Sequence, residues 1–253
     1  MFTYKSLLSI VISSLYLAHG FSLNNYFDAA IDRHINKEFF PSGQISNKKL
    51  LAFSYALFSI NCFISYKISV NIVCLVVLGS ATCLIYSAPL LRLKKNTLLN
   101  IILNSLGFSI IFLIGFTTVS NSITPAALMM TMLFAIVFIP LQIVHQISHS
   151  EADKIENIQS VYNRFGFERA ALFLNLSLVL LMLWSLLISV IYREYVYIFY
   201  LTSLLCFFFF YSLRRIKNNK KPYHESAVEA RLLLRKICVL YGISIFFFFY
   251  FTK

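Results

Sequence analysis

The feature that most constrains this chain is a series of eight apolar stretches, each long enough to cross a lipid bilayer. They lie at about 6–26, 50–66, 68–87, 97–118, 124–146, 169–192, 195–213 and 236–252. A membrane-spanning helix needs about 20 mostly apolar residues, and its backbone must satisfy its own polar groups. The sequence therefore predicts an all-α, polytopic transmembrane helical bundle of about eight spans, in a single domain over residues 1–253.

The composition excludes the water-soluble classes of protein. Of the 253 residues, 59% are hydrophobic and only 13% are charged. A soluble domain is typically about 45–50% apolar and about 25% charged. There is too little polar surface here for a cytosolic enzyme, a disordered tail or a secreted disulfide scaffold. The five cysteines lie inside apolar runs without a CxxC pair, so they are expected to be buried and reduced.

The charges are distributed unevenly over the predicted loops. The chain carries 22 Lys and Arg against 10 Asp and Glu, a net charge of +12. Nearly all of these residues fall in alternate loops, which is the pattern of cytoplasmic loops rather than of a nucleic-acid-binding surface. We therefore expect the lipid bilayer as a partner, no nucleic acid, and no identifiable protein partner. The default location is a bacterial inner membrane, with the acidic motifs on the cytoplasmic side.

The first acidic motif lies at the end of the first span. Asn24, Asp28 and Asp32 are spaced i, i+4, i+8, which places them on one helical face. Two carboxylates and an amide on one face favour a cation between them, and Mg²⁺ prefers such oxygen ligands. The alternative is a solvated helix end paired with Arg33 or Lys37, and the spacing alone supports both interpretations equally.

A second motif ends the fifth span. His145, His149 and Asp153 repeat the i, i+4, i+8 spacing, and Glu151 lies off that face. Two acidic helix ends on the same side of a membrane can converge on one cation cluster. Taken alone, the pattern favours a polar interfacial loop with histidines capping a helix, because an isolated His is seldom a ligand.

Together these motifs resemble those of the UbiA superfamily of integral-membrane prenyltransferases. Residues 24–32 match the NxxxDxxxD motif, and residues 145–153 resemble the second acidic motif, DxxxD or DxEGD. Residues 36–46 resemble the segment N-K-x-x-x-P-S-G-x-I-S, and residues 86–94 resemble the loop Y-S-x-P-P-L-R-L-K. Residues 164–166 fall where the family often has R-x-G. The matches cover about 6–170 in the family's order, and the last three spans match only as hydrophobic helices.

The resemblance implies Mg²⁺-dependent transfer of a prenyl group from an isoprenyl diphosphate to a lipophilic acceptor within the membrane. The residues implied to hold metal are Asn24, Asp28, Asp32, His149, Glu151 and Asp153. Of these, Asp28, Asp32 and Asp153 are implied to be catalytic. Tyr86, Arg92 and Lys94 are implied to bind the diphosphate, and an ordinary basic cytoplasmic loop is the alternative for these three.

Two departures from the family pattern leave other functions open. His149 stands where the family has Asp, and the chain is expected to begin at the family's second helix. The alternatives are a UbiA-type terpene cyclase, in which the carbocation closes on itself, and a degenerate homologue that binds isoprenoids without turnover. A transporter is a further alternative, although the sequence shows no inverted repeat that would favour it.

Overall fold

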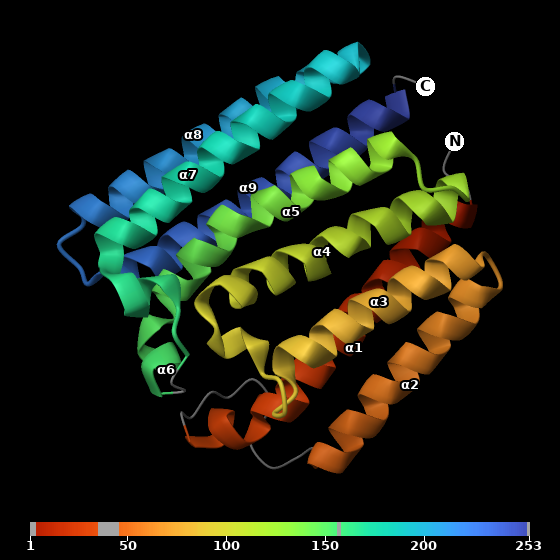
Figure 1. The fold of residues 1–253 in the computed structure, drawn as a ribbon, viewed down its shortest axis with the longest axis horizontal. Helices are drawn as coiled ribbons and strands as arrows, with labels where there is room; N and C mark the ends of the chain where they lie inside the picture. Colours follow the sequence, from red (N-terminus) through yellow and green to blue (C-terminus); the bar gives the residue numbers. More distant parts are fainter. Residues whose placement is uncertain (1–3, 35–45, 156–157, 252–253) are drawn as a thin grey trace. The chain divides into compact units, whose positions relative to one another are not determined.

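The structure is a computed structural model that describes residues 4–34, 46–155 and 158–251, with the side chains of 29–34 and 246–251 left aside. Within these residues the chain forms nine α-helices and two short 3-10 helices, without strands. The chain divides into two compact units, residues 1–134 and 135–253. The prediction of an all-α fold is confirmed, and Figure 1 shows the helices in chain order.

Unit 1 contains four complete long helices and the beginning of a fifth. They are α1 (Tyr4–His34), α2 (Asn47–Tyr66), α3 (Val70–Ser87), α4 (Thr97–Ser120) and the first part of α5 (Pro125–Ser148), with the 3-10 helix η1 (Leu93–Lys95) before α4. Small polar side chains fix the helix starts: Ser46 accepts from the backbone of Lys49, and Asn96 accepts from the first turn of α4. Such caps satisfy backbone N–H groups that have no partner within the helix.

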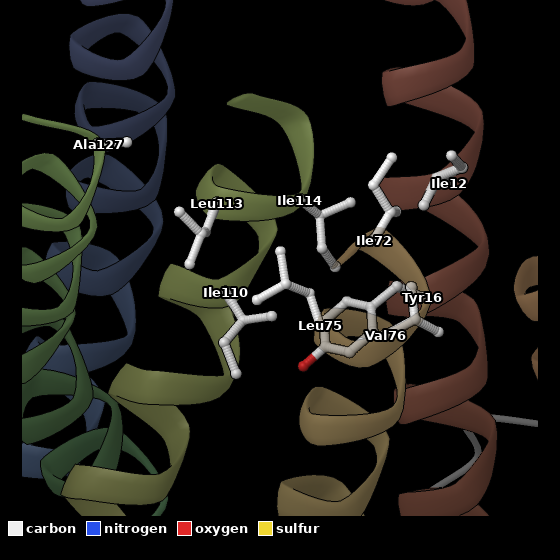
Figure 2. Close-up of a cluster of buried hydrophobic side chains, with 9 residues drawn as sticks. All are labelled: Ile12, Tyr16, Ile72, Leu75, Val76, Ile110, Leu113, Ile114 and Ala127. Carbon is white, nitrogen blue, oxygen red and sulfur yellow. The ribbon is translucent and has the colours of Figure 1, made fainter. Parts of the chain in front are cut away.

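The core of unit 1 is built around α1, which packs against α2, α3 and α4. Figure 2 shows the buried side chains from α1, α3, α4 and α5, which are Ile12, Tyr16, Ile72, Leu75, Val76, Ile110, Leu113, Ile114 and Ala127. Tyr16 packs closely on Gly79: a Cβ atom added at Gly79 would lie 2.7 Å from the hydroxyl oxygen of Tyr16. The same hydroxyl donates to the carbonyl of Gly107 at 3.0 Å, which ties α1 to α4.

Buried polar side chains join α1 to α2. The Nδ1 atom of His19 lies 2.9 Å from the hydroxyl of Ser54, and the side-chain amide of Asn61 donates to the carbonyl of Ile12 at 3.2 Å. Hydrogen bonds of this kind act as fixed points between helices whose other contacts are apolar. The end of α1 is therefore positioned by three neighbouring helices of its unit.

Unit 2 contains the rest of α5 and the last four α-helices. They are α6 (Ser150–Ile155), α7 (Val161–Ile191), α8 (Val196–Asn218), which follows the 3-10 helix η2 (Arg193–Tyr195), and α9 (Tyr223–Phe251). α7 packs on α8, and α8 packs on α9. The hydroxyls of Thr202 and Tyr241 lie 2.8 Å apart and join α8 to α9. α7 bends at Gly166, whose φ of 76° and ψ of 177° are not helical.

Seven helices of the described part are long and apolar enough to cross a membrane. They correspond to the first seven predicted spans. The eighth, at 236–252, falls within α9, which continues past the last residue whose side chain is described. The chain is thus a multi-pass integral membrane protein. The main difference from the predicted boundaries is that α1 and α7 extend into polar sequence. As a result, the first acidic motif lies on α1.

Candidate functional site

The first acidic motif occupies the last turns of α1. Asn24 and Asp28 lie one helical turn apart, and Asp28 is buried, with 8% of its surface exposed. The backbone of Asp32 is helical, and its side chain lies outside the described residues. The motif at residues 36–46 lies outside them as well, except for Ser46. The predicted helical face is confirmed for the backbone of the whole motif.

A buried acid–base cluster surrounds Asp28. The ammonium group of Lys94, itself 4% exposed, donates a hydrogen bond to Oδ1 of Asp28. Nη2 of Arg92 lies 3.7 Å from the same oxygen. Charged side chains are rarely buried unless they are paired, so Asp28 and Lys94 stabilise each other's burial, and the partly exposed Arg92 adds a second positive charge nearby. The structure therefore brings together three residues that the sequence assigned to two different motifs.

The loop between α3 and α4 places these cations. Its tight turn requires a left-handed backbone at Arg92, with φ 35° and ψ 50°, before η1 begins. The side chain of Asn100 then donates to the carbonyl of Lys94 at 2.8 Å. At the other end, the Ser87 hydroxyl donates to Oδ1 of Asn24 at 2.8 Å and joins α3 to the motif on α1. The loop is thus fixed from both sides.

Two further features lie close to these residues in the sequence. Tyr86, the third residue implied to bind diphosphate, is half-buried in the last turn of α3. An open hollow of about 370 Å³ lies at the loop, lined by Pro89, Leu91, Arg92, Leu93, Lys95 and Asn96. Arg92 therefore both lines a space that is open to a ligand and approaches the carboxylate of Asp28.

The second motif continues the helical spacing from α5 into α6. The backbone N–H of His149 donates to His145 at 3.1 Å, and that of Asp153 donates to His149 at 2.9 Å. The two imidazole rings lie 4.4 Å apart. Both contact Arg231 of α9: its Nη1 atom is 3.0 Å from Nδ1 of His145 and touches Nε2 of His149. The predicted i, i+4, i+8 alignment is confirmed, and Arg231 joins it.

The acids of the second motif have different environments. Glu151 is exposed and forms an ion pair with Lys154 at 2.9 Å, and the hydrogen bond from Lys154 lowers the pKa of the Glu151 carboxyl. Asp153 is half-buried. The connection that follows is held by Gln146, whose side-chain oxygen accepts from the backbone of Val161 at 2.9 Å.

The two motifs differ in how well they suit Mg²⁺. The first offers an amide oxygen and a buried carboxylate oxygen, which are hard ligands of the kind that Mg²⁺ takes together with substrate phosphates. In the second, the nitrogen of His149 is already in contact with Arg231, which competes with its implied role as a metal ligand. Among the described residues, no three His, Cys, Asp or Glu side chains are grouped to hold a metal. The first motif therefore fits the metal, and the histidine side of the second does not.

The sequence did not identify three residues of these clusters. Arg231 is one of many basic residues between the last two predicted spans, and no spacing distinguishes it. Asn100 has no motif around it. Ser87 carried a signal, because it lies inside the Y-S segment of the family resemblance. The convergence of the two motifs on one cation cluster stays a prediction, since they lie in different compact units.

The fold and the two polar clusters define a multi-pass membrane protein with paired acids and cations at the ends of its helices. Residues 3–234 match the UbiA prenyltransferase family, and the chain belongs to this family. The family resemblance of the four motifs is therefore confirmed over nearly the whole chain.

Three known proteins illustrate the relationship. Digeranylgeranylglyceryl phosphate synthase of Saccharolobus solfataricus is 31% identical over 95% of this chain and 83% of its own length. The chloroplastic chlorophyll synthase of Oryza sativa subsp. japonica is 29% identical over 66% of this chain and 46% of its own. A solved UbiA homologue from Archaeoglobus fulgidus, bound to GPP and Mg²⁺, has a TM-score of 0.75 at 19% identity. That similarity covers 96% of this chain and 88% of the homologue.

Proposed function

We propose that this chain transfers a prenyl group from an isoprenyl diphosphate to a lipid-soluble acceptor in the membrane, in a Mg²⁺-dependent reaction. The observation that carries the proposal is the buried cluster of Asp28, Lys94 and Arg92 in a member of the UbiA prenyltransferase family. The cluster combines a metal-binding carboxylate with two cations that suit a diphosphate. The whole chain, with both units, is proposed to act as one catalytic domain.

The first motif is assigned to the metal. Asn24, Asp28 and Asp32 offer the oxygen ligands, and bound Mg²⁺ supplies positive charge that neutralises the diphosphate leaving group. Asp153, with Glu151 beside it, is the acidic part of the second motif and is also assigned to metal.

The loop cations are assigned to the diphosphate. Lys94 and Arg92 donate N–H groups to its non-bridging oxygens, and Tyr86 adds a hydroxyl. When the bond between the allylic carbon and the diphosphate breaks, the electron pair leaves with the diphosphate. Donors that already point at the oxygens stabilise this growing negative charge without having to reorganise.

The apolar helices provide the rest of the reaction environment. The allylic carbocation reacts with water wherever water reaches it, so the isoprenoid must be held in an apolar, dry space. Bond formation to an oxygen or a ring carbon of the acceptor then completes the transfer, and the acceptor loses its proton.

The relatives support one class of acceptor over another. The archaeal relative, by its name, makes digeranylgeranylglyceryl phosphate, and the plant relative makes chlorophyll. The archaeal relative matches a larger share of this chain at slightly higher identity, and we therefore propose a glycerol phosphate lipid with a free hydroxyl as the first acceptor to test. The basic loops support an orientation with the acidic motifs on the cytoplasmic side, and a bacterial inner membrane is the proposed location.

The test is an assay of the full chain in membranes, supplied with Mg²⁺ and labelled geranyl, farnesyl or geranylgeranyl diphosphate. A prenylated lipid together with released diphosphate supports transfer. A cyclic hydrocarbon instead of a prenylated lipid contradicts transfer and indicates a cyclase. Binding without diphosphate release indicates a degenerate homologue.

A pair of variants makes the assay specific to the cluster. Asp28→Asn removes the buried charge that is assigned to Mg²⁺ and is expected to lower turnover by about two to three orders of magnitude, the loss typical of one essential electrostatic contact. Glu168→Gln is the matched control, because it removes an exposed carboxylate that pairs only with Lys217 at 3.1 Å among the described residues. Equal activity of the two variants would contradict the assignment.

A further inference from the structure

The guanidinium of Arg231 reaches the second motif from α9 and contacts both of its histidines. Nη1 lies 3.0 Å from Nδ1 of His145 and touches Nε2 of His149. A guanidinium has only N–H donors, so a ring nitrogen that hydrogen-bonds to it is the acceptor. The pair of rings therefore orients Arg231 without cancelling its charge.

The other edge of the same guanidinium carries the Nε and Nη2 atoms. Nε of Arg231 is buried and makes no hydrogen bond with any residue in the described part of the chain. Buried N–H groups normally have a partner. Nε and Nη2 together form the fork that binds two oxygens of a phosphate side by side. The cluster thus leaves available the edge of arginine that is best suited to an anion.

The charges explain why an arginine suits this position. The family motif places an Asp at position 149, and an aspartate that holds a Mg²⁺ ion carries a net charge of +1. A neutral histidine that holds an arginine carries the same net charge. The departure at His149 and the contact with Arg231 therefore compensate each other, which a merely decayed motif would not be expected to show.

We propose that Arg231 takes the place of a metal ion at the second motif and binds an oxygen of a diphosphate group directly, oriented by His145 and His149. This inference rests on the proposed prenyltransferase function. It differs from the expectation of metal at both motifs. Here only the first motif binds Mg²⁺, and the arginine supplies a permanent positive charge at the second.

The first experiment counts metal ions and needs no variant. The full chain in lipid nanodiscs is titrated with Mn²⁺ in the presence of geranylgeranyl diphosphate and without acceptor, and bound Mn²⁺ is followed by electron paramagnetic resonance. The inference predicts a single tightly bound ion, which Asp28→Ala removes. Two tightly bound ions in the wild-type chain would overturn it.

The second experiment measures geranylgeranyl diphosphate affinity as a function of Mg²⁺ concentration. Arg231→Ala is expected to weaken binding by about tenfold to a hundredfold, the loss typical of hydrogen bonds to a charged group, and added Mg²⁺ should not restore it. Arg231→Lys keeps the charge but loses the fork, so its affinity should lie between those of the wild type and Arg231→Ala. Arg235→Ala, one turn further along α9 and exposed, is the matched control and should bind as the wild type does.

A double variant tests the exchange of arginine for metal. His149→Asp alone should bind no additional Mn²⁺, because Arg231 pairs with the new carboxylate. Combined with Arg231→Ala, it should gain a second Mn²⁺ ion and recover Mg²⁺-dependent affinity. Failure of the double variant to gain metal, or unchanged affinity in Arg231→Ala, would overturn the inference while leaving the proposed function intact. A wild-type chain that binds no prenyl diphosphate would overturn both.

Discussion

The ammonium group of Lys94 donates to the carboxylate of Asp28 across 66 positions of sequence. The pair joins the end of α1 to the loop after α3, and both side chains are almost completely buried. The carboxylate that is assigned to the metal is therefore already neutralised by a cation that is assigned to the substrate. In the proposed function, Asp28 would hold Mg²⁺ and Lys94 would donate to the diphosphate oxygens instead of to this carboxylate.

Removing one partner of this pair should destabilise unit 1. Lys94→Met leaves the buried carboxylate of Asp28 with Arg92 at 3.7 Å as its only remaining described cation. Breaking a buried ion pair from one side costs about 3–5 kcal/mol. Because Arg92 remains beside the carboxylate, the loss of stability should be at the lower end of this range. Thermal unfolding of the purified chain in detergent measures the loss.

The double variant Lys94→Met/Asp28→Leu separates stability from function. It removes both charges, so stability should return to near the wild-type value, since a buried ion pair is often replaceable by apolar residues. Prenyl transfer should be lost, because the residues proposed to bind the metal and the diphosphate are both replaced. A double variant no more stable than Lys94→Met would show that the pair is not the source of the stability loss.

The sequence predicted the helices well, because each span is recognisable as an apolar run with charged residues at its ends. It also placed Asn24 and Asp28 on one face and aligned His145 with His149, since these relations depend only on helical periodicity. Both predictions describe residues that lie four positions apart in the sequence.

Contacts between helices could not be predicted from the sequence pattern. Lys94 was assigned to the diphosphate from its motif, and nothing local indicated that it would be buried against Asp28. Arg231 lies 82 positions from His149. Its basic character is explained equally well by the charge bias of cytoplasmic loops, so pattern alone could not single it out. The left-handed backbone of Arg92 could not be predicted either, because this conformation usually occurs at glycine and here the turn imposes it on an arginine.

The contact between Tyr16 and Gly79 should make Gly79 intolerant of any side chain. A Cβ at this position would lie 2.7 Å from the hydroxyl oxygen of Tyr16, whose ring is fixed by its bond to Gly107. Overpacking of this kind costs about 1–3 kcal/mol, so Gly79→Ala should lower the thermal stability of the chain. Gly115→Ala is the control, because no atom lies within 4 Å of its added Cβ. Equal stabilities of the two variants would contradict the packing argument.

Glu229 gives the connection between α8 and α9 a dependence on pH. It pairs with Lys221 at 3.1 Å and Arg215 at 3.4 Å, and the hydrogen bond from Lys221 lowers the pKa of its carboxyl. A lowered folded-state pKa means that the stabilisation is present above the ordinary Glu pKa and is lost as the pH falls through the folded-state value. The effect should be small and sensitive to salt, because all three groups are exposed.

Glu229→Gln imitates the protonated carboxyl at neutral pH and allows this expectation to be measured. At low salt, trypsin should cleave the segment 217–221 faster in the variant than in the wild-type chain, since the pairs that hold it to α9 are lost. At high salt the difference should disappear, because screening weakens the same pairs in the wild type. Identical cleavage at low salt would show that the ion pairs do not restrain the segment.

The bend at Gly166 sets the direction in which α7 leaves the second motif. Its φ of 76° and ψ of 177° lie in a region that essentially only glycine occupies, and no atom stands within 4 Å of an added Cβ. Gly166→Ala should therefore cost about 1–3 kcal/mol through the backbone alone, with no steric contribution. Gly242→Ala in α9 has the same open surroundings without the positive φ, so it should not lower the unfolding temperature. A loss of stability in both variants, or in neither, would show that the backbone of Gly166 is not what limits substitution there.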